Sequence, residues 1–534
     1  MPGRLGIDFG TSNTVLAVWD KARNEATPLQ IAEYSRTLRY RQAGKEGEEI
    51  AIIPSLIHYA ADGRRWLGQQ VVVQELAESE RTFRWMKRYI GHRSPIQLNI
   101  DGRSISHFEA GRDFLSAVLT FAVDALDCRD EEIGLTVPVE AFEHYEHWLT
   151  SVVEATGLRR FRLIDEPSAA ALGYGAFLEP QNVYLIFDFG GGTLDVSVIL
   201  IEDPTRTHGQ RCRVLGKAGV EIGGASIDQW LFQEALRQAG RSDSDDEVRP
   251  VSRALLAACE RTKEQLTFRD QAELNVAAAD GSPIRASFSR ESLEALFDRH
   301  EGFRQIEKTI RRALLAAHER GYAEDQIKEV FLVGGSSLIP AVQRTVQRVF
   351  GRERVRLQRP LDAVARGAAA LVAGVDFEDY VQHDYALRFV EARGSGDYAY
   401  RPLVSRGTPY PTREPIARIV VKASHDKQTQ LGLAIFELAE GKSTGGEQTL
   451  ELVFDPSGAA RMTQVTPDEA ERRHRFWINE SAPTFLHADP PAKQGEPRFE
   501  VEFNIDSNKR LLVTARDLTT KQITLKDYPV VKLS

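Results

Sequence analysis

Two glycine turns carry the residues whose types and spacing could do chemistry. The stretch LIFDFGGGTLDVSVIL, residues 185–200, has β-prone apolar runs on both sides of three glycines, with Asp188 before the turn and Asp195 after it. The N-terminal stretch RLGIDFGTSNTVLAVW repeats the order strand, Asp-Phe-Gly, Thr, strand, with Asp8 as its aspartate. Bare backbone N–H groups in such turns bind phosphate well, because glycine allows a tight bend and a close approach.

Two such turns that face each other would hold a polyphosphate from both sides. The residues expected to contact phosphate are Gly10, Thr11, Ser12, Asn13, Gly190, Gly191, Gly192 and Thr193, the threonines through their hydroxyls. Carboxylates repel phosphate, so Asp8, Asp188 and Asp195 suit a Mg²⁺ ion that keeps most of its waters. Asp195 or a neighbour could orient an attacking water. A glycine-rich hairpin with aspartate as a turn former is the structural alternative for either turn alone, but the duplication argues against it.

Two later stretches add candidates for the same site. LIDEPSAAALGYG, residues 163–175, places Glu166 and Pro167 before a helix of small residues, where the carboxylate could be a further water-mediated magnesium ligand and the alanines allow close helix contact. EVFLVGGSSLIPAVQRTVQRVFG, residues 329–351, predicts a strand, the turn Gly334-Gly335-Ser336 and a helix, which is a suitable opening for a nucleotide. Each stretch taken alone also fits a purely structural role.

The elements around these motifs are those of a large α/β protein. The chain has 534 residues, enough for two to four domains. From Leu5 to about Val375, β-prone runs alternate with amphipathic helical patterns such as 112–126 and 139–158. After about Asp376 the pattern predicts an antiparallel β domain whose strands are 416–424, 431–438, 450–455, 498–505 and 510–517. An acidic connector precedes it, and the stretches 242–247 and 481–497 are predicted to be surface loops.

Bulk properties exclude several classes of function. A net charge of −9 argues against nucleic acid as a general partner. No apolar run approaches the length of a membrane span, and the strand beginning at Leu5 leaves no room for a signal peptide. Cys128, Cys212 and Cys259 lack metal-ligand spacing, which indicates buried thiols in a reducing compartment. We therefore expect a cytoplasmic protein.

In this order, the four stretches resemble the actin-like ATPase superfamily, which includes actins, sugar kinases and DnaK-type heat shock protein 70 chaperones. Further motifs favour the chaperones. RTFRWMKRYIGHR (81–93) is similar to their catalytic-lysine segment, through Lys87, and LTVPVEAF places Pro138 at their switch proline. Segments 219–231, 255–268 and 359–374 resemble their Gly-Gly segment, adenosine-contacting helix and closing helix. The resemblance runs from Leu5 to about Gly374.

The resemblance implies a fold, an activity and a set of site residues. The fold is a two-lobed actin-like (ASKHA, ribonuclease H-like) ATPase domain over 1–376, a linker at 377–384, and an antiparallel β-sandwich domain over 385–534 without a helical lid. The implied ligands are ATP or ADP and Mg²⁺. The implied catalytic residues are Lys87, Asp195, Asp188, Glu166 and Thr193. Besides the turn residues, those implied to contact nucleotide are Gly223, Gly224, Glu260, Lys263, Thr267, Gly334, Gly335, Ser336, Leu338 and Asp362.

The C-terminal region is similar, more weakly, to the family's peptide-binding sandwich. Stretches 405–441 and 498–522 follow its order of strands and turns, and Leu431 falls near a pocket-forming aliphatic position, although an ordinary core residue fits equally well. Departures from the family pattern are Glu146 in place of the arginine that partners the switch proline, and Glu264 and Leu338 in place of arginines around adenine. Arg162 matches a position that contacts J-domain partners.

The function predicted from the sequence is an ATP-dependent chaperone. ATP hydrolysis in the N-terminal cleft would control how the β domain binds extended, unfolded polypeptide, with a J-domain co-chaperone and a nucleotide exchange factor as further partners. Glu146 and a connector poor in leucine keep a second hypothesis open, a nucleotide-binding regulatory or scaffold protein without a coupled cycle. A small-molecule kinase of the same superfamily is the third hypothesis, but no second substrate pocket is evident.

Overall fold

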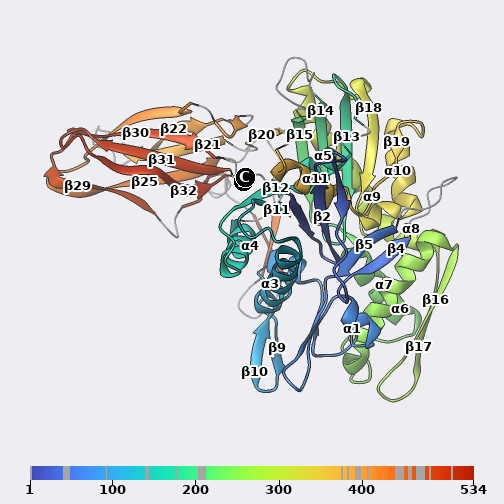
Figure 1. Ribbon diagram of the computed structural model, residues 1–534. Helices are drawn as coiled ribbons and strands as arrows, with labels where there is room; N and C mark the ends of the chain where they lie inside the picture. Colours follow the sequence, from blue (N-terminus) through green and yellow to red (C-terminus); the bar gives the residue numbers. More distant parts are fainter. Residues whose placement is uncertain are drawn as a thin grey trace. The chain divides into compact units, whose positions relative to one another are not determined.

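The computed structural model describes residues 3–39, 49–91, 93–138, 143–174, 178–201, 212–374, 377–381, 384–390, 398–405, 408–412, 414–438, 450–454, 460–464, 475–479, 483–506 and 509–533. The chain divides into two compact units, Met1–Phe377 and Glu378–Ser534. The first is mixed α/β, and the described elements of the second are strands (Figure 1).

The first unit begins with a sheet in the order β12-β11-β1-β2-β5-β4, with β3 beside β2. Its strands are β1 Leu5–Phe9, β2 Asn13–Asp20, β3 Glu25–Pro28, β4 Arg36–Arg39, β5 Glu49–Pro54, β11 Ile133–Val137 and β12 Phe161–Asp165. Apolar side chains of this sheet and of the long helices α3 and α4 form one buried cluster. The neighbouring elements are β6 Ile57–Tyr59, β7 Arg65–Leu67, α1 Gln69–Val73, β8 Thr82–Phe83, α2 Met86–Gly91, β9 Gln97–Ile100, β10 Arg103–Ser106, α3 His107–Leu126 and α4 Glu143–Ala155.

Local sequence explains where α3 starts and where α4 stops. The predicted helix 112–126 is confirmed within α3, which begins earlier because Ser106 and Glu109 form a capping box: Ser106 Oγ accepts from the Glu109 N–H at 3.2 Å, and Glu109 Oε2 accepts from the Ser106 N–H at 2.9 Å. Helix α4 falls within the predicted 139–158, of which residues 139–142 lie outside the described residues. It ends at Ala155, and Gly157 follows with φ +81°, a conformation that favours glycine.

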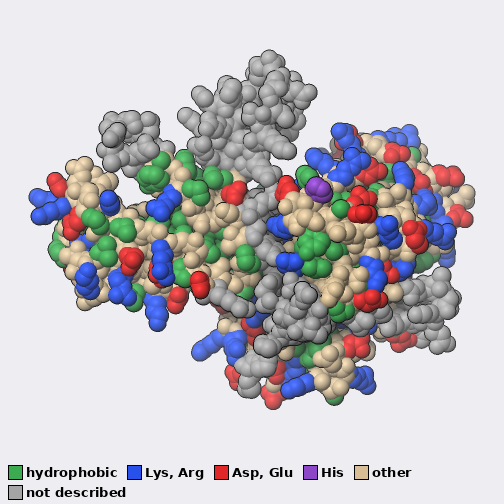
Figure 2. Space-filling view, turned by 90° about the horizontal axis from the view of Figure 1, so that it is seen from above, with side chains coloured by type: hydrophobic (Ala, Val, Ile, Leu, Met, Phe, Trp, Pro, Cys, Tyr) green, Lys and Arg blue, Asp and Glu red, His purple; other side chains and the backbone are tan. Residues whose placement is uncertain are grey.

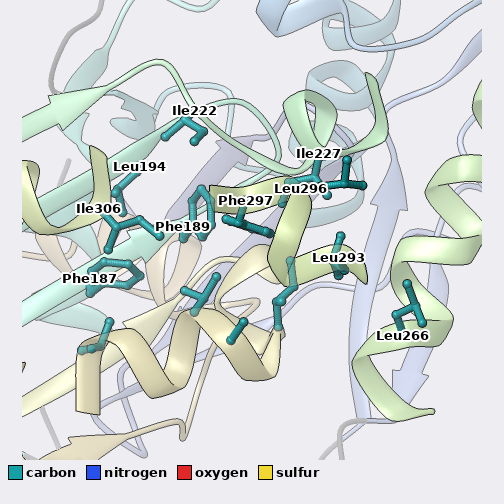
Figure 3. Close-up of a cluster of buried hydrophobic side chains, with 14 of the residues drawn as sticks. Phe187, Phe189, Leu194, Ile222, Ile227, Leu266, Leu293, Leu296, Phe297 and Ile306 are labelled. Carbon is teal, nitrogen blue, oxygen red and sulfur yellow. The ribbon is translucent and has the colours of Figure 1, made fainter. Parts of the chain in front are cut away.

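A second sheet, in the order β19-β18-β13-β14-β15, forms the other half of the first unit. Its strands are β13 Val183–Phe189, β14 Leu194–Ile201, β15 Cys212–Val220, β18 Ile327–Val333 and β19 Val355–Arg356. Its buried cluster joins Phe187 and Phe189 of β13 to Phe297 of α8 and Ile306 of α9 (Figure 3). The remaining elements on this side are α6 Gly224–Gln238, η2 Arg249–Val251, α7 Ser252–Phe268, β16 Gln271–Ala277, β17 Pro283–Ser289, α8 Arg290–Arg299, α9 Gly302–His318, η3 Glu324–Gln326, η4 Gly335–Leu338 and α10 Pro340–Phe350.

Two helices of small residues, α5 Glu166–Gly173 and α11 Ala363–Val372, pack backbone to backbone (Figure 1). A Cβ on Gly367 would collide with the backbone of Ala169, and a Cβ on Gly173 with the backbone of Ala363. The same α11 contacts the first sheet, since a Cβ on Gly134 would lie 2.8 Å from the Ala368 carbonyl oxygen. The close helix contact expected from the alanine-rich stretch is therefore present.

The second unit contains two larger antiparallel sheets that share one buried cluster. The first has the order β22-β21-β25-β28, with β29 also beside β25, and the second is β24-β30-β31-β32. The strands from residue 377 onward are β20 Phe377–Tyr380, β21 Asp384–Val390, β22 Tyr398–Val404, β23 Pro409–Tyr410, β24 Ala417–Lys422, β25 Gln428–Leu438, β26 Leu450–Phe454, β27 Ala460–Gln464, β28 Arg475–Trp477, β29 Thr484–Ala492, β30 Pro497–Ile505, β31 Arg510–Asp517 and β32 Ile523–Lys532. The five strands predicted after residue 376 are confirmed.

One predicted loop is wrong. The proline-rich stretch 481–497 contains β29, which pairs antiparallel with β25. Leu486 and Ala488 are buried while Phe485 and His487 are exposed, so the side chains alternate as in a half-buried strand. Pro483 directly precedes this alternating part and Pro490 and Pro491 follow it, which obscured the strand in the sequence. Leu431 of β25 is 2% exposed and belongs to the shared core, which is its structural role.

The segment predicted as a connector begins with strand β20, of which Asp379 and Tyr380 pair with Tyr410 and Pro409 of β23. Residues 382 and 383 of that segment lie outside the described part of the chain.

Acidic and basic side chains are interspersed over the visible face of the molecule (Figure 2). Among the described residues, no helix combines the length and the apolar character that crossing a membrane requires.

Candidate functional site

The first glycine turn joins β1 to β2 and is held by hydrogen bonds from Ser55, the residue after β5. Ser55 Oγ donates to the Gly10 carbonyl at 2.8 Å, and the Ser55 N–H donates to the Ser12 carbonyl at 2.9 Å. A Cβ on Gly10 would collide with the Asn13 carbonyl, so the turn needs glycine at this position. The carbonyls are thereby engaged inside the protein.

The second glycine turn, between β13 and β14, touches the first. It is closed by the Gly190 N–H donating to the Thr193 carbonyl at 3.0 Å. A Cβ on Gly192 would lie 2.6 Å from Thr11 Oγ1, and a Cβ on Gly191 would lie 3.0 Å from Ser12 Oγ. The structure therefore brings the two turns face to face, although one belongs to each sheet.

Two further glycine segments pack around the second turn. The N–H groups of Gly224 and Ala225, at the start of α6, donate to the carbonyls of Gly190 and Gly191 at 3.1 and 2.8 Å. Gly223 itself is a packing residue, because a Cβ there would lie 2.6 Å from the Gly191 carbonyl carbon.

The turn before η4 completes this arrangement. Ser336 Oγ donates to the Gly190 carbonyl at 2.8 Å. Gly334 has φ +80°, and a Cβ on it would lie 2.6 Å from Asp188 Oδ1. Three glycine-rich segments thus converge on the β13–β14 turn, and side chains at these positions would fill the space between them.

Four charged groups lie beneath the turns. Asp8 near the end of β1 is partly exposed, whereas Lys87 of α2, Glu166 at the start of α5 and Asp188 near the end of β13 are buried. Lys87 forms an ion pair with Glu166. Asp8 Oδ1 accepts a hydrogen bond of 3.0 Å from Thr136. The cluster contains three carboxylates and one lysine, and its charge is therefore unbalanced.

The imbalance is visible in the acid–base behaviour of the cluster. Burial raises the pKa of Asp188 well above its ordinary value, and the carboxylates of Glu166, Asp195 and Asp8 add to the increase. Burial also raises the pKa values of Asp8 and Glu166, against the opposing effect of Lys87. A positive charge brought to this point would relieve the repulsion among the carboxylates.

A divalent cation fits this donor set if it keeps water ligands. Within the described residues, no three histidine, cysteine, aspartate or glutamate side chains form a group that could bind a metal ion directly. Carboxylates that hold a hydrated ion through its waters need no such grouping, and Mg²⁺ characteristically keeps several waters. Asp8, Glu166 and Asp188 would hold those waters.

The far end of the site is built on α7. Lys263 Nζ forms an ion pair of 2.8 Å with Asp228 of α6 and donates to the Gly224 carbonyl at 3.2 Å, which joins α7 to the glycine segment. Glu260 forms an ion pair with Arg84. Thr267 lies one turn after Lys263, and its hydroxyl donates to the Lys263 carbonyl at 3.3 Å.

These groups line one cavity of about 410 Å³. The predicted site residues on its wall are Asp8, Gly10, Thr11, Ser12, Asn13, Lys87, Glu166, Asp188, Gly190, Gly191, Gly192, Thr193, Gly224, Glu260, Lys263, Thr267, Gly334, Gly335, Ser336 and Leu338. Three predicted residues lie off the wall. Gly223 packs behind Gly191. Asp195 lies opposite Asp188 in the β13–β14 ladder, and its side chain is 1% exposed. Asp362 is fully buried and forms an ion pair with Arg366.

The wall also contains residues that sequence reasoning missed. Arg36, Leu38 and Ile52 come from the β4–β5 hairpin, and Phe268 is the last residue of α7. Tyr145, which lies within the predicted helix 139–158, is 3% exposed and lies near Lys87 and Glu166. Phe268 ends the segment 255–268, in which only Glu260, Lys263 and Thr267 were predicted as contacts. No local motif distinguishes the other residues, because their place on the wall depends on how distant segments pack.

The fold and the cavity define a class: a mixed α/β protein with two sheets, a pair of facing glycine turns and a buried acid–lysine cluster between them. The family model described as Hsp70 protein matches residues 96–444, more than half of the chain. The chain belongs to the Hsp70 family. Members of this family are ATP-binding chaperones whose ATPase has the two-lobed actin-like fold.

Proposed function

We propose that this protein binds ATP with Mg²⁺ in the cavity and hydrolyses it, and that the nucleotide state controls how the second unit binds extended polypeptide. The observation that carries the proposal is the convergence of two glycine turns, one from each sheet, on three carboxylates and a single lysine. That arrangement suits a polyphosphate accompanied by a cation.

The glycine turns and the charged cluster have defined roles in this proposal. Backbone N–H groups of both turns, other than that of Gly190, which donates to the Thr193 carbonyl, bind the phosphates, and the hydroxyls of Thr11 and Thr193 donate to phosphate oxygens. Lys87, held by Glu166, places a fixed positive charge where negative charge develops during phosphoryl transfer to water. Asp8, Glu166 and Asp188 would hold a hydrated Mg²⁺ ion, which would supply further positive charge to the phosphates, and Asp188 orients water at its side of the site.

Asp195 takes a positioning role. It is buried directly across the β13–β14 ladder from Asp188 and does not line the cavity. Burial and the charge of Glu166 are the two largest causes of the raised pKa of Asp188, and the negative charge of Asp195 is the next. We therefore assign the water-orienting role to Asp188 and a supporting role to Asp195.

The second unit supplies the polypeptide-binding part of the proposal. We propose that its two sheets form a β-sandwich in which an extended peptide pairs with an exposed edge or groove. Strand β24 is at one edge of its sheet, and Val420 on it is 49% exposed although apolar. Such an edge offers backbone hydrogen bonds and apolar contact to a partner strand.

The test measures turnover and peptide release in the full chain. We expect an unfolded peptide to change the steady-state ATPase rate, and ATP to speed release of a labelled peptide relative to ADP. Addition of a J-domain protein should stimulate turnover further. Absence of any ATP hydrolysis in the presence of Mg²⁺ would contradict the enzymatic part.

A second function has one observation in its favour. Glu146 of α4 follows Tyr145, a cavity residue, at the position where the family resemblance places an arginine. An acid cannot supply a guanidinium's donors, so a nucleotide-binding regulatory or scaffold protein without a coupled cycle is the alternative. An ATPase rate that peptide does not change, together with a peptide release rate that ATP does not change, would favour this alternative.

A further inference from the structure

The cavity has two ends with different charge. At one end Asp8, Lys87, Glu166 and Asp188 influence one another's pKa values. At the other end, Glu260, Lys263 and Glu264 of α7 lie on the wall with Arg36, and desolvation and Glu260 raise the pKa of Glu264 against the opposing charges of Lys263, Arg36 and Arg261. A ligand that spans both ends would place its phosphates at the first end, where the two glycine turns meet.

The second end has apolar and aromatic walls. They are formed by Leu38, Ile52, Phe268, Leu338, Ile339 and Leu361. Phe268 is 75% exposed, the most exposed of the large apolar side chains among the described residues, and it faces the cavity from the last position of α7. An exposed aromatic ring beside a cavity offers a stacking surface for a planar ligand group.

Arg36 reaches the same end from another part of the chain. It begins β4, a strand of the first sheet, whereas Phe268 and Glu264 belong to α7, whose apolar residues Leu255 and Leu266 pack in the core of the second sheet. The Arg36 Nε is buried and has no hydrogen-bond partner among the described residues. A buried guanidinium N–H without an acceptor is costly, and a ligand that supplies an acceptor would remove this cost.

We infer that Arg36 and Phe268 contact the purine base of the bound nucleotide from the two sides of the cavity and distinguish a base-bearing ligand from bare polyphosphate. This rests on the nucleotide binding proposed above. Phe268 stacks on the base, and Arg36 donates to a ring nitrogen or a ribose oxygen. These two residues supply the aromatic surface and the planar cation that Glu264 and Leu338 cannot.

The experiment compares ADP with tripolyphosphate, both with Mg²⁺, by calorimetric titration of the full chain. Phe268→Ala should weaken ADP binding about tenfold, because stacking of one base on an aromatic ring has about that value. Arg36→Lys keeps the charge but loses the planar fork, and should weaken ADP binding about fivefold. Binding of tripolyphosphate should stay within about twofold in both variants.

Two matched controls lie away from the cavity. Leu315→Ala removes an apolar side chain of α9 that is 57% exposed, and Arg23→Lys alters an arginine that pairs with Asp20 on the surface. Both should bind ADP as the parent does. Within each variant, comparison of the ADP affinity with the tripolyphosphate affinity also checks folding, because a misfolded variant would lose both.

The outcomes separate the two hypotheses. Loss of ADP affinity with retained tripolyphosphate affinity supports the inference. If the parent binds ADP and both variants bind it equally well, the inference is wrong and the proposed function stands. If the parent binds neither ligand, the proposed function fails and the inference fails with it.

Discussion

Two neighbouring carboxylates, Asp165 and Glu166, each bind a lysine, yet the two ion pairs have different surroundings. Asp165 ends β12 and pairs with Lys217 of β15, whose side chain is fully buried, so this pair joins the two sheets. Glu166 begins α5 and pairs with Lys87 on the cavity wall, beside Asp8 and Asp188. The chemistry of the pair is the same, and access to the cavity decides which lysine can act on a ligand.

The Asp165–Lys217 pair is expected to be structural. A buried ion pair pays a large desolvation cost and adds little net stability, but removal of one partner leaves a buried charge uncompensated. The Lys87 pair is different because excess carboxylates surround it and a ligand can enter. Substitution of each lysine should therefore give opposite patterns in activity and stability.

The largest effect is expected from Lys87→Ala. Turnover should fall about a thousandfold, or about 4 kcal/mol of barrier, because a fixed positive charge at the transferring phosphoryl group is lost. Single-turnover hydrolysis measures the rate, and nucleotide titration should show that ATP still binds. Lys328→Ala is the control, since that lysine lies on the surface and pairs with Glu179. Turnover preserved in Lys87→Ala would remove this lysine from the mechanism.

The next largest effect is expected from Lys217→Met. The substitution leaves Asp165 buried without its lysine and should lower the free energy of unfolding by about 3 kcal/mol. Urea unfolding of the first unit checks this, and hydrolysis at a temperature where the variant is folded should stay within about threefold of the parent.

A double-variant cycle sharpens the same prediction. Asp165→Asn removes the stranded charge, so the double variant should be more stable than the sum of the two single losses predicts. Strict additivity would show that the two side chains do not interact. Loss of hydrolysis in a folded Lys217→Met variant would mean that the two ion pairs do not divide their roles as proposed.

A third buried pair, Arg498–Asp517 in the second unit, gives a smaller effect with a defined pH dependence. Burial would raise the pKa of Asp517, but hydrogen bonds from Arg498 and from the backbone of Thr520 and Thr519 hold it below its ordinary value of 3.8. A lowered pKa stabilises the folded state above pH 4, and this stabilisation is lost as the pH falls through the folded-state value.

Asp517→Asn should therefore lower the stability of the second unit by about 2 kcal/mol at pH 7. The difference from the parent should shrink as the pH falls below 4. Urea unfolding followed by fluorescence of Trp477, the one tryptophan after residue 377, measures this transition. A difference that stays constant from pH 7 to pH 3 would contradict the assignment.

The glycine-turn end of the cavity could be predicted from sequence because the residue types expected for phosphate binding follow one another locally. Glycines, threonines and aspartates must follow one another at fixed spacing to make a phosphate turn, and both turns are continuous in the chain. The helices α3 and α4 and five strands of the second unit could be predicted for a similar reason, since their periodicity is local. Strand β29 could not, because prolines follow its alternating half.

The α7 end of the cavity could be predicted only in part, because much of it is assembled by packing. Glu260, Lys263 and Thr267 lie in a segment with a recognisable resemblance, whereas Arg36 reaches the same wall from β4 without a distinctive neighbourhood in the sequence. Asp362 matched the resemblance but is fully buried and paired with Arg366, so burial decided its role. The burial of a charged side chain by tertiary contacts, as at Lys217, cannot be predicted from neighbouring residues in the sequence either.

The smallest effect is expected from Arg162→Ala. Arg162 of β12 pairs with Glu132 at 3.2 Å, and both side chains are partly exposed, at 32% and 23%. Unlike the buried pairs, this one is screened by solvent, so its loss should change the free energy of unfolding by less than about 1 kcal/mol. Because the resemblance places Arg162 at a J-domain contact, stimulated turnover should fall while basal turnover stays unchanged. Glu132→Gln is the matched control, since it breaks the same ion pair and keeps the arginine; equal loss of stimulation in both variants would mean that the pair, and not a partner contact, is responsible.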